Sequence, residues 1–189
     1  MYLCELEEML GGMGEPKFRA KQIFKWLQSG VTDFSEMTNI PKSLAEKLDE
    51  SCYIASVGIV RRFASRLDET VKYVYELFDG EYIESVLMKY EHGYTVCIST
   101  QVGCRMGCSF CASGINGLTR SLTASEMLAQ ITAAQRDNGI RISNVVMMGM
   151  GEPLDNFDNS VRFLKLVSDE NGLNIGLRHI SLSASGVVS

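Results

Sequence analysis

Three cysteines, Cys104, Cys108 and Cys111, have the spacing that most directly predicts chemistry. They lie at positions i, i+4 and i+7 of the run CRMGCSFC, and Gly103 and Gly107 allow the backbone to wrap closely around a bulky ligand. Three thiolates can hold three irons of a cubane cluster and leave the fourth iron open, whereas four thiolates complete the cluster and suit electron transfer. The spacing therefore predicts a three-thiolate iron-sulfur site with one open iron.

Other chemistries remain open for the same thiols. They could be small buried hydrophobic side chains, or a zinc site completed by Cys97 or a histidine, although zinc sites more often pair two C-x-x-C segments. Cys97 could also complete a four-cysteine cluster in a small electron carrier. Taken alone, Cys97 in TVCIST is most often a buried strand thiol.

Two polar positions follow predicted strands. Glu152, in Gly-Glu-Pro after the strand NVVMMG, could accept a charge-assisted hydrogen bond from an ammonium group, because ligands gather at the carboxyl ends of parallel strands. The alternative is a plain turn. Ser183, expected on a third parallel strand in SLSASG, has a second interpretation as a serine satisfied by neighbouring backbone.

Glu84 lies in the predicted strand YIESVLM. It shares a strand face with Tyr82, Val86 and Met88, so we expect apolar surroundings that favour the neutral acid and tune it as a base. A solvent-facing strand glutamate is the commoner meaning of this pattern.

The elements that must position these residues fall into three segments. The pattern predicts a small helical unit for residues 1–52, with helices over 16–28 and from Pro41. For residues 53–93 it predicts an antiparallel β meander with a hairpin turn at Asp79-Gly80. Residues 94–189 alternate strand and helix, with a capping box at Thr123 and Glu126, which predicts parallel βαβ units. The sheet would keep an open edge and an uncovered apolar face, so we expect a piece of a longer protein.

Composition limits the class of protein. The 189 residues are 46% hydrophobic with a net charge of -5, and contain no apolar run long enough for a membrane span and no secretory signal. We therefore expect a cytoplasmic protein whose six cysteines are thiols for metal or redox chemistry. Contact with nucleic acid would need a local basic patch, and the helix over 16–28 offers Lys17, Arg19, Lys21 and Lys25.

At this point the sequence resembles a known family. The runs CISTQVGCRMGCSFCASGINGLTR, NVVMMGMGEPLDN and ISLSASGVV are similar to the radical S-adenosylmethionine (SAM) methyltransferases that modify adenine C2 in 23S ribosomal RNA and transfer RNA. The segments FRAKQIFKWL and DFSEMTNIPKSLAEKL resemble that family's N-terminal RNA-binding domain. The resemblance implies a truncated α/β fold: a partial (β/α) barrel of radical SAM type that follows the helical domain and the meander in the sequence.

The resemblance also implies roles for individual residues. Cys104, Cys108 and Cys111 would ligate a 4Fe-4S cluster whose open iron binds SAM, while Gly151, Glu152 and Ser183 would contact SAM. Glu84 matches the family's proton acceptor. In the family, a cysteine near the C terminus carries the methyl group to adenine as a carbon radical, and the cysteine at the position of Cys97 helps release the RNA adduct through a disulfide. The carrier cysteine has no counterpart in these residues, so the chain alone is expected to be inactive.

The implied partners are 23S rRNA and tRNA, together with an electron-donating redox protein, and the chain is expected to be a monomer without membrane contact. Three alternatives stay open: a related adenine-C8 methyltransferase, an iron-sulfur electron carrier, and an RNA-binding module without catalysis.

Overall fold

The N-terminal segment is a compact group of helices. The computed structural model describes residues 1–186, which leaves 187–189 of the expected third segment outside the description. Helices α2 and α3 confirm the two predicted helices, with Ala20, Ile23 and Leu44 buried as expected. Helix α1, which buries Leu6 and Leu10, had no specific prediction. The bounds are α1 Leu3–Gly12, α2 Phe18–Ser29, the 3-10 turn η1 Phe34–Glu36 and α3 Lys42–Ser51.

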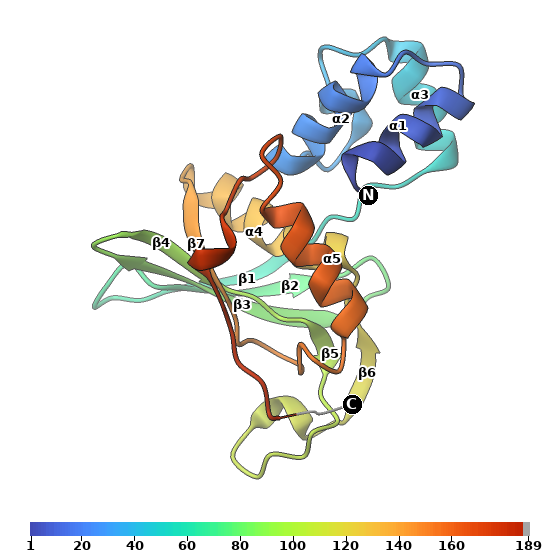
Figure 1. The fold of residues 1–189 in the computed structure, drawn as a ribbon. Coiled ribbons are helices and arrows are strands. Elements are labelled where there is room, and N and C mark those ends of the chain that lie inside the picture. The colour runs from blue at the N-terminus through green and yellow to red at the C-terminus, as the bar shows by residue number, and fades with distance from the viewer. Residues whose placement is uncertain (187–189) are drawn as a thin grey trace.

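One six-stranded sheet follows, in the order β1-β2-β3-β4-β7-β8 (Figure 1). Strands β1 to β4 pair antiparallel, as expected of a meander, and β4, β7 and β8 pair parallel, as expected of βαβ units. The expected division after residue 93 therefore falls inside β4, in the middle of a continuous sheet. The strands are β1 Gly58–Ala64, β2 Val71–Glu76, β3 Tyr82–Tyr90, β4 Gly93–Cys97, β7 Ile142–Met147 and β8 Ile180–Leu182.

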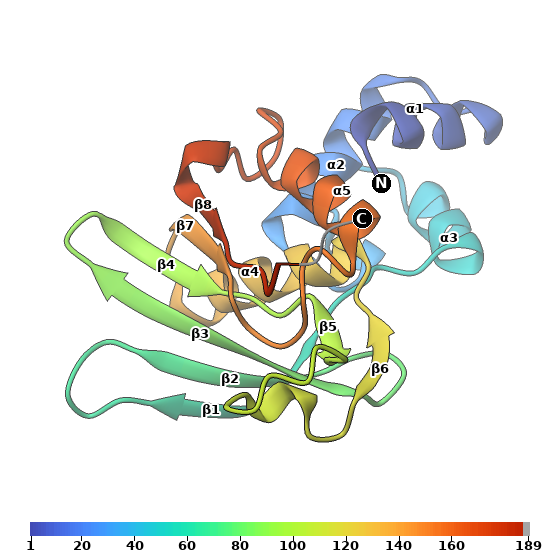
Figure 2. The ribbon, with the colours of Figure 1, turned by 60° about the horizontal axis from the view of Figure 1, so that its bottom comes forward.

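Two helices, α4 (Ala124–Asn138) and α5 (Phe157–Val167), pack on the same face of the sheet (Figure 2). Val96, Ile131 and Phe163 belong to the shared core and are fully buried. The predicted capping box starts α4: the Thr123 hydroxyl accepts from the Glu126 amide at 3.2 Å, and the Glu126 carboxylate accepts from the Thr123 amide at 2.8 Å. The helices leave the opposite face of the sheet free to form a site.

A small two-stranded ribbon was missed by the sequence reasoning. Strand β5 (Gln101–Gly103) pairs antiparallel with β6 (Leu118–Ser121), and the cysteines lie in the loop between them, which includes the 3-10 turn η2 (Ala112–Gly114). Strands this short carry almost no periodicity, which explains the omission. A further 3-10 turn, η3 (Leu177–His179), precedes β8.

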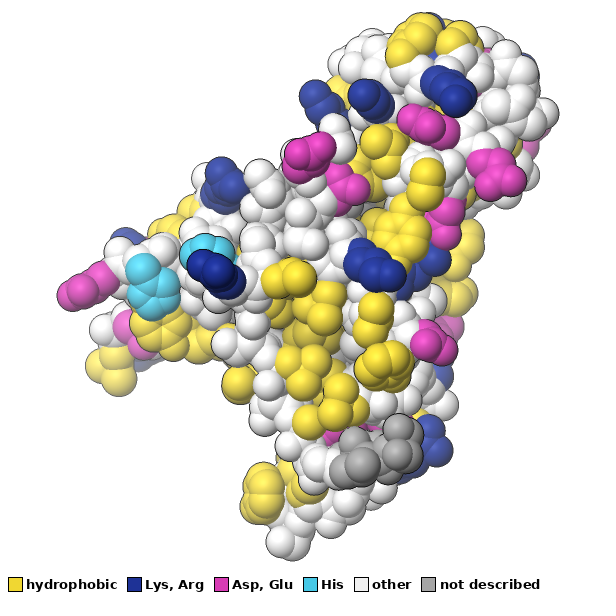
Figure 3. Space-filling model, viewed as in Figure 1, with side chains coloured by type: hydrophobic (Ala, Val, Ile, Leu, Met, Phe, Trp, Pro, Cys, Tyr) yellow, Lys and Arg dark blue, Asp and Glu magenta, His cyan; other side chains and the backbone are white. Residues whose placement is uncertain are grey.

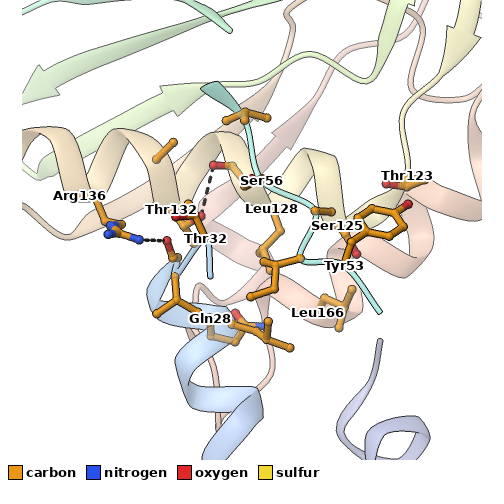
Figure 4. Close-up of a pocket in the computed structure, with 18 of the residues that line it drawn as sticks. Gln28, Thr32, Tyr53, Ser56, Thr123, Ser125, Leu128, Thr132, Arg136 and Leu166 are labelled. Atoms are coloured by element: carbon orange, nitrogen blue, oxygen red, sulfur yellow. Dashed lines mark hydrogen bonds between the residues drawn. The ribbon is translucent and has the colours of Figure 1, made fainter. Parts of the chain in front are cut away.

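The helical domain docks on the core through polar contacts around a cavity (Figure 4). Arg136 of α4 donates to the main-chain carbonyl of Gly30 and, at 2.9 Å, to the Glu36 carboxylate. Gln28, only 5% exposed, accepts from the Leu173 amide at 3.2 Å. A cavity of about 620 Å³ lies between α2, the connecting segment 53–57 and α4.

Within residues 1–186 the sheet ends at β1 and β8, and neither strand has a further pairing partner in that sheet. Every residue of β1 is exposed, and β8 forms the other edge. Hydrophobic side chains gather over α5 and its surroundings in Figure 3, and Phe157 and Leu182 are among the exposed large apolar residues. Within residues 1–186, no helix is both long and apolar enough to cross a membrane.

Candidate active site

The sheet brings the cysteine loop and the Gly-Glu-Pro turn together. The two segments follow β4 and β7, which are adjacent and parallel, so both leave the sheet at the carboxyl ends of these strands. Three backbone hydrogen bonds join them beyond the strand ends: the Gly149 amide donates to Ile98 at 3.0 Å, and the Thr100 and Gln101 amides donate to Met150 at 2.8 and 3.2 Å. Ligands bind at the carboxyl ends of the strands in parallel α/β folds.

The ribbon pins both ends of the cysteine loop. The Cys104 amide donates to the Gly117 carbonyl at 3.0 Å, and the Cys111 amide donates to the Cys108 carbonyl at 3.0 Å. Gly103 has φ of +75°, and a Cβ there would lie 2.0 Å from the Gly117 carbonyl oxygen, so this crossing admits only glycine. Gly107 also has a positive φ, +67°, but nothing lies within 4 Å of an added Cβ, so only its backbone conformation favours glycine.

The three thiols differ in exposure. Cys104 is buried, Cys108 half-buried and Cys111 exposed, where hydrogen bonds from Ser113 lower the pKa of the Cys111 thiol. In the part of the chain that the structure describes, no three Cys, His, Asp or Glu side chains converge as a metal-binding group. Metal ligands take their bound arrangement together with the metal, so the expected triad is present as one loop and not as a converged set.

The loop nevertheless fits an iron-sulfur cluster. Its donors are three soft thiols within eight residues on a closed loop. Phe110 and Ile115 of the same loop are 92% and 79% exposed, so the loop has little apolar core of its own. A cluster held by these thiols would instead tie the loop together through metal–sulfur bonds.

Glu152 is buried inside the turn, with 4% of the residue exposed. One carboxylate oxygen accepts from the Leu154 amide at 3.0 Å and the other from the Ser185 amide at 2.7 Å. Each oxygen keeps a second lone pair for an external donor. Ser183 does not lie on a strand as expected: β8 ends at Leu182, and Ser183 is exposed one residue later. The strand stops short because pairing with β7 ends at Met147.

Cys97 lines a cavity of about 590 Å³ on the sheet face opposite the helices. Its neighbours across the sheet are Val86 of β3 and Val146 of β7, and burial raises the pKa of its thiol. Among the residues that the structure describes, none of the three loop cysteines lines this cavity. The geometry therefore gives no support to Cys97 as a fourth ligand.

The expected apolar surroundings of Glu84 are wrong. Glu84 does share the half-exposed face of β3 with Val86, but its carboxylate pairs with Lys72 of β2 at 2.8 Å and its side chain is 46% exposed. Lys72 lies opposite Val86 in the register, one diagonal step from Glu84. The lysine that defines this environment belongs to another strand and could not be read from YIESVLM.

The basic stripe on α2 is only partly free. Lys17, Lys21 and Lys25 are exposed, but Arg19 is half-buried and donates to the Gln22 side chain at 2.8 Å and to the Asn39 carbonyl at 3.1 Å. Arg19 therefore holds the domain together instead of joining the exposed lysines.

Comparison with known proteins agrees with this arrangement. Residues 1–54 match the family described as the ribosomal RNA large subunit methyltransferase N-terminal domain, and residues 98–189 match the radical SAM superfamily. A protein from Alkaliphilus oremlandii named probable dual-specificity RNA methyltransferase RlmN is 56% identical over 98% of this chain, and its Clostridium novyi counterpart 53% identical over 98%. The chain belongs to the RlmN family of radical SAM proteins.

A solved structure supports the same assignment. The radical SAM methyltransferase from Sphaerobacter thermophilus superposes with a TM-score of 0.93 at 44% identity, covering 99% of this chain and 56% of that one. The chain likewise spans 54% of both curated relatives, that is, about half their length. Membership of the superfamily implies a 4Fe-4S cluster and SAM as cofactors.

Sequence reasoning missed the polar residues that surround the site. The side chain of fully buried Gln101 donates to the Asp155 carboxylate at 2.8 Å. The side-chain amide nitrogen of Asn156 donates to the carbonyls of Thr100 and Leu122 at 2.9 and 2.7 Å. Asp155 and Asn156 directly follow Gly-Glu-Pro-Leu in the sequence. For Asp155 and Asn156, their place in the turn that follows the buried strand β7 was the available signal.

Proposed function

We propose that the chain forms the cluster- and cofactor-binding part of a radical SAM RNA methyltransferase that methylates adenine C2 in 23S rRNA and tRNA. The observation that supports this proposal most directly is that the segments leading into the cysteine loop and into the Gly-Glu-Pro turn, residues 98–101 and 149–150, are joined by main-chain hydrogen bonds at the carboxyl ends of the parallel strands β4 and β7. The names of the relatives support RNA methylation, since they are dual-specificity RNA methyltransferases.

The loop and the turn have separate tasks in this proposal. Cys104, Cys108 and Cys111 would hold the cluster, and Glu152 with Gly151 would hold the amino end of SAM. When bound, the cluster and SAM supply one-electron chemistry that reaches the electron-poor C2 carbon of adenine. The buried Glu152 carboxylate, fixed by two backbone amides, suits an ammonium group because charge-assisted hydrogen bonds are strong away from water. Ser183 would add a contact from the end of β8.

Cys97 and Glu84 would act from the free face of the sheet. Burial raises the pKa of the Cys97 thiol, which favours its protonated form until it reacts. In the release step its thiolate would attack the sulfur of the methyl-carrying cysteine; the S–S bond would form as the bond from that sulfur to the adduct carbon breaks, and the carbon would keep the electron pair and take up a proton. Glu84 shares that face, one diagonal step from Cys97. Its ion pair with Lys72 requires an ionised carboxylate, which is the form that accepts a proton and can pass it to solvent.

Anaerobic reconstitution tests the cluster and the cofactor together. We expect the wild-type protein to take up iron and to change its cluster spectrum when SAM is added, and Cys104→Ala, Cys108→Ala and Cys111→Ala to lose both properties. The matched control is Cys4→Ala, an exposed thiol outside the loop. An iron spectrum that SAM leaves unchanged would instead indicate an electron carrier.

Product analysis tests the reaction. Mass spectrometry of RNA modified by the protein together with the remaining part found in its relatives should detect 2-methyladenine, and 8-methyladenine would overturn the proposal. RNA binding that survives loss of all three loop cysteines, without any modification, would support the binding-module alternative.

One-electron chemistry needs an external donor, so the proposal includes an electron-donating redox protein. Reduction of the reconstituted cluster by a flavodoxin or ferredoxin type of carrier, followed by optical spectroscopy, is the test. A monomeric state belongs to the same proposal and is tested by sedimentation of the protein with and without RNA.

A further inference from the structure

Gln101 is a fully buried amide at the point where the ribbon meets the Gly-Glu-Pro turn. Its oxygen accepts from the Glu152 main-chain amide at 2.9 Å. Its nitrogen donates to the Asp155 carboxylate at 2.8 Å and to the Ser121 hydroxyl at 3.3 Å. One side chain therefore ties β5 to β6 and to the segment that carries Glu152.

Asp155 extends this connection to the cysteine loop. The same carboxylate oxygen that accepts from Gln101 also accepts from the Arg105 guanidinium at 2.9 Å, and Arg105 directly follows Cys104 in the chain. The Asp155 side chain is 16% exposed and that of Arg105 60% exposed. The Gln101 amide, with Arg105 as a further cause, holds the pKa of Asp155 below its usual value, so the carboxylate is ionised at neutral pH.

The packing leaves the two segments little freedom to separate. A Cβ on Gly151 would lie 2.5 Å from the Gln101 Cβ and 2.7 Å from the Gln101 main-chain nitrogen. The turn and β5 are therefore in direct contact beside the hydrogen bonds. Because the Gln101 amide must accept from one partner and donate to another, neither a carboxylate nor an apolar side chain can replace it.

We propose that Gln101 and Asp155 are positioning residues that fix the cysteine loop relative to Glu152, with Arg105 as the contact on the loop. The inference rests on the proposed function, because it assigns to these residues the alignment of the cluster thiols with the SAM-binding carboxylate. Neither side chain needs to touch the cluster or SAM for this role. Outer residues that orient ligands typically change affinity by about 10- to 100-fold when they are substituted.

Asp155→Asn is the main variant, and Asp158→Asn is its matched control, since Asp158 is an exposed carboxylate in the first turn of α5. Hydrogen exchange of the protein without cofactors comes first. We expect faster exchange of the loop amides 104–117 in Asp155→Asn and unchanged exchange in Asp158→Asn.

The second readout is a SAM titration of the anaerobically reconstituted protein, followed by the electron paramagnetic resonance of the reduced cluster. We expect Asp155→Asn to retain its iron and to require about 10-fold more SAM for half of the spectral change. Arg105→Gln should show the same shift, and Arg105→Lys should restore part of the response because it keeps a cationic donor.

The outcomes separate this inference from the proposed function. If SAM leaves the spectrum of the wild-type cluster unchanged, the proposed function is overturned. If the wild type responds and Asp155→Asn matches it in both exchange and titration, only the positioning role is overturned. If Asp155→Asn does not fold, Arg105→Gln decides, because its exposed side chain can be changed without opening the core, and a wild-type titration in that variant would overturn the inference.

Discussion

Gly151→Ala should damage the site through two separable effects. The first is backbone strain, because Gly151 has φ of +98° and an L-residue with positive φ costs about 1 to 2 kcal/mol. The second is overlap with Gln101, whose Cβ and main-chain nitrogen lie 2.5 and 2.7 Å from the position of the new methyl group. Forcing an extra carbon into packed surroundings costs about 1 to 3 kcal/mol.

Gly80→Ala isolates the first effect. Gly80 has φ of +81°, close to that of Gly151, but nothing lies within 4 Å of its added Cβ. We therefore expect a loss of about 1 to 2 kcal/mol for Gly80→Ala and about 2 to 5 kcal/mol for Gly151→Ala.

Urea unfolding followed by circular dichroism measures both losses. In a thermal scan, a difference of about 2 kcal/mol between the variants corresponds to about 4 to 8 °C for a chain of this size. Equal unfolding free energies for Gly80→Ala and Gly151→Ala would refute the reasoning, since they would mean that the close approach to Gln101 adds nothing.

Three other predictions concern the capping box of α4, the buried Cys97 thiol and the contacts of Arg136 with the helical domain. Thr123→Ala should lower the unfolding free energy by about 1 kcal/mol because α4 loses its N-cap, and an unchanged urea midpoint would contradict this. Alkylation of Cys97 should keep accelerating at higher pH in the folded protein than in the urea-unfolded chain, since the thiolate reacts and burial raises the Cys97 pKa. Peptide mass spectrometry measures both rates, and identical pH profiles would argue against it. Arg136→Ala should speed proteolysis in segment 53–57 by removing two contacts that dock the helical domain, whereas exposed Arg141→Ala should leave the cleavage rate as in the wild type.

The sequence was sufficient for the elements with long, regular patterns. Helix α4 was predictable because Thr123 and Glu126 mark its start and apolar residues recur at helical spacing. The hairpin at Gly80 was predictable because Asp-Gly favours a tight turn. The parallel pairing of the strands in 94–189 then followed, because helices connect them. The cysteine loop was predictable as a motif without any knowledge of the fold.

The parts that escaped prediction depend on partners distant in sequence. The environment of Glu84 was wrong because Lys72 reaches it from another strand. Gln101 carried no local signal, although it contacts Asp155 more than fifty residues away. Arg19 was expected among exposed basic residues, yet it bonds to the Asn39 carbonyl. Spacing along the chain reports which residues share an element, but not which side chains meet across elements.

The β5–β6 ribbon also determines where the cysteine loop can vary. Because paired strands already hold the loop ends together, the entropy of closing the loop is lost during folding, before any ligand binds. Doubling the length of a flexible loop adds only about 0.6 kcal/mol to that entropy, so extra residues near exposed Ile115 are tolerable. Val102→Pro would remove an N–H group from the ribbon, where Val102 pairs with Arg120. The loop ends would then be less firmly held together in the folded protein, and the entropy of closing the loop would be lost when the ligand binds. The length of the cysteine loop near Ile115 can therefore vary, whereas the pairing of β5 with β6 has to be kept.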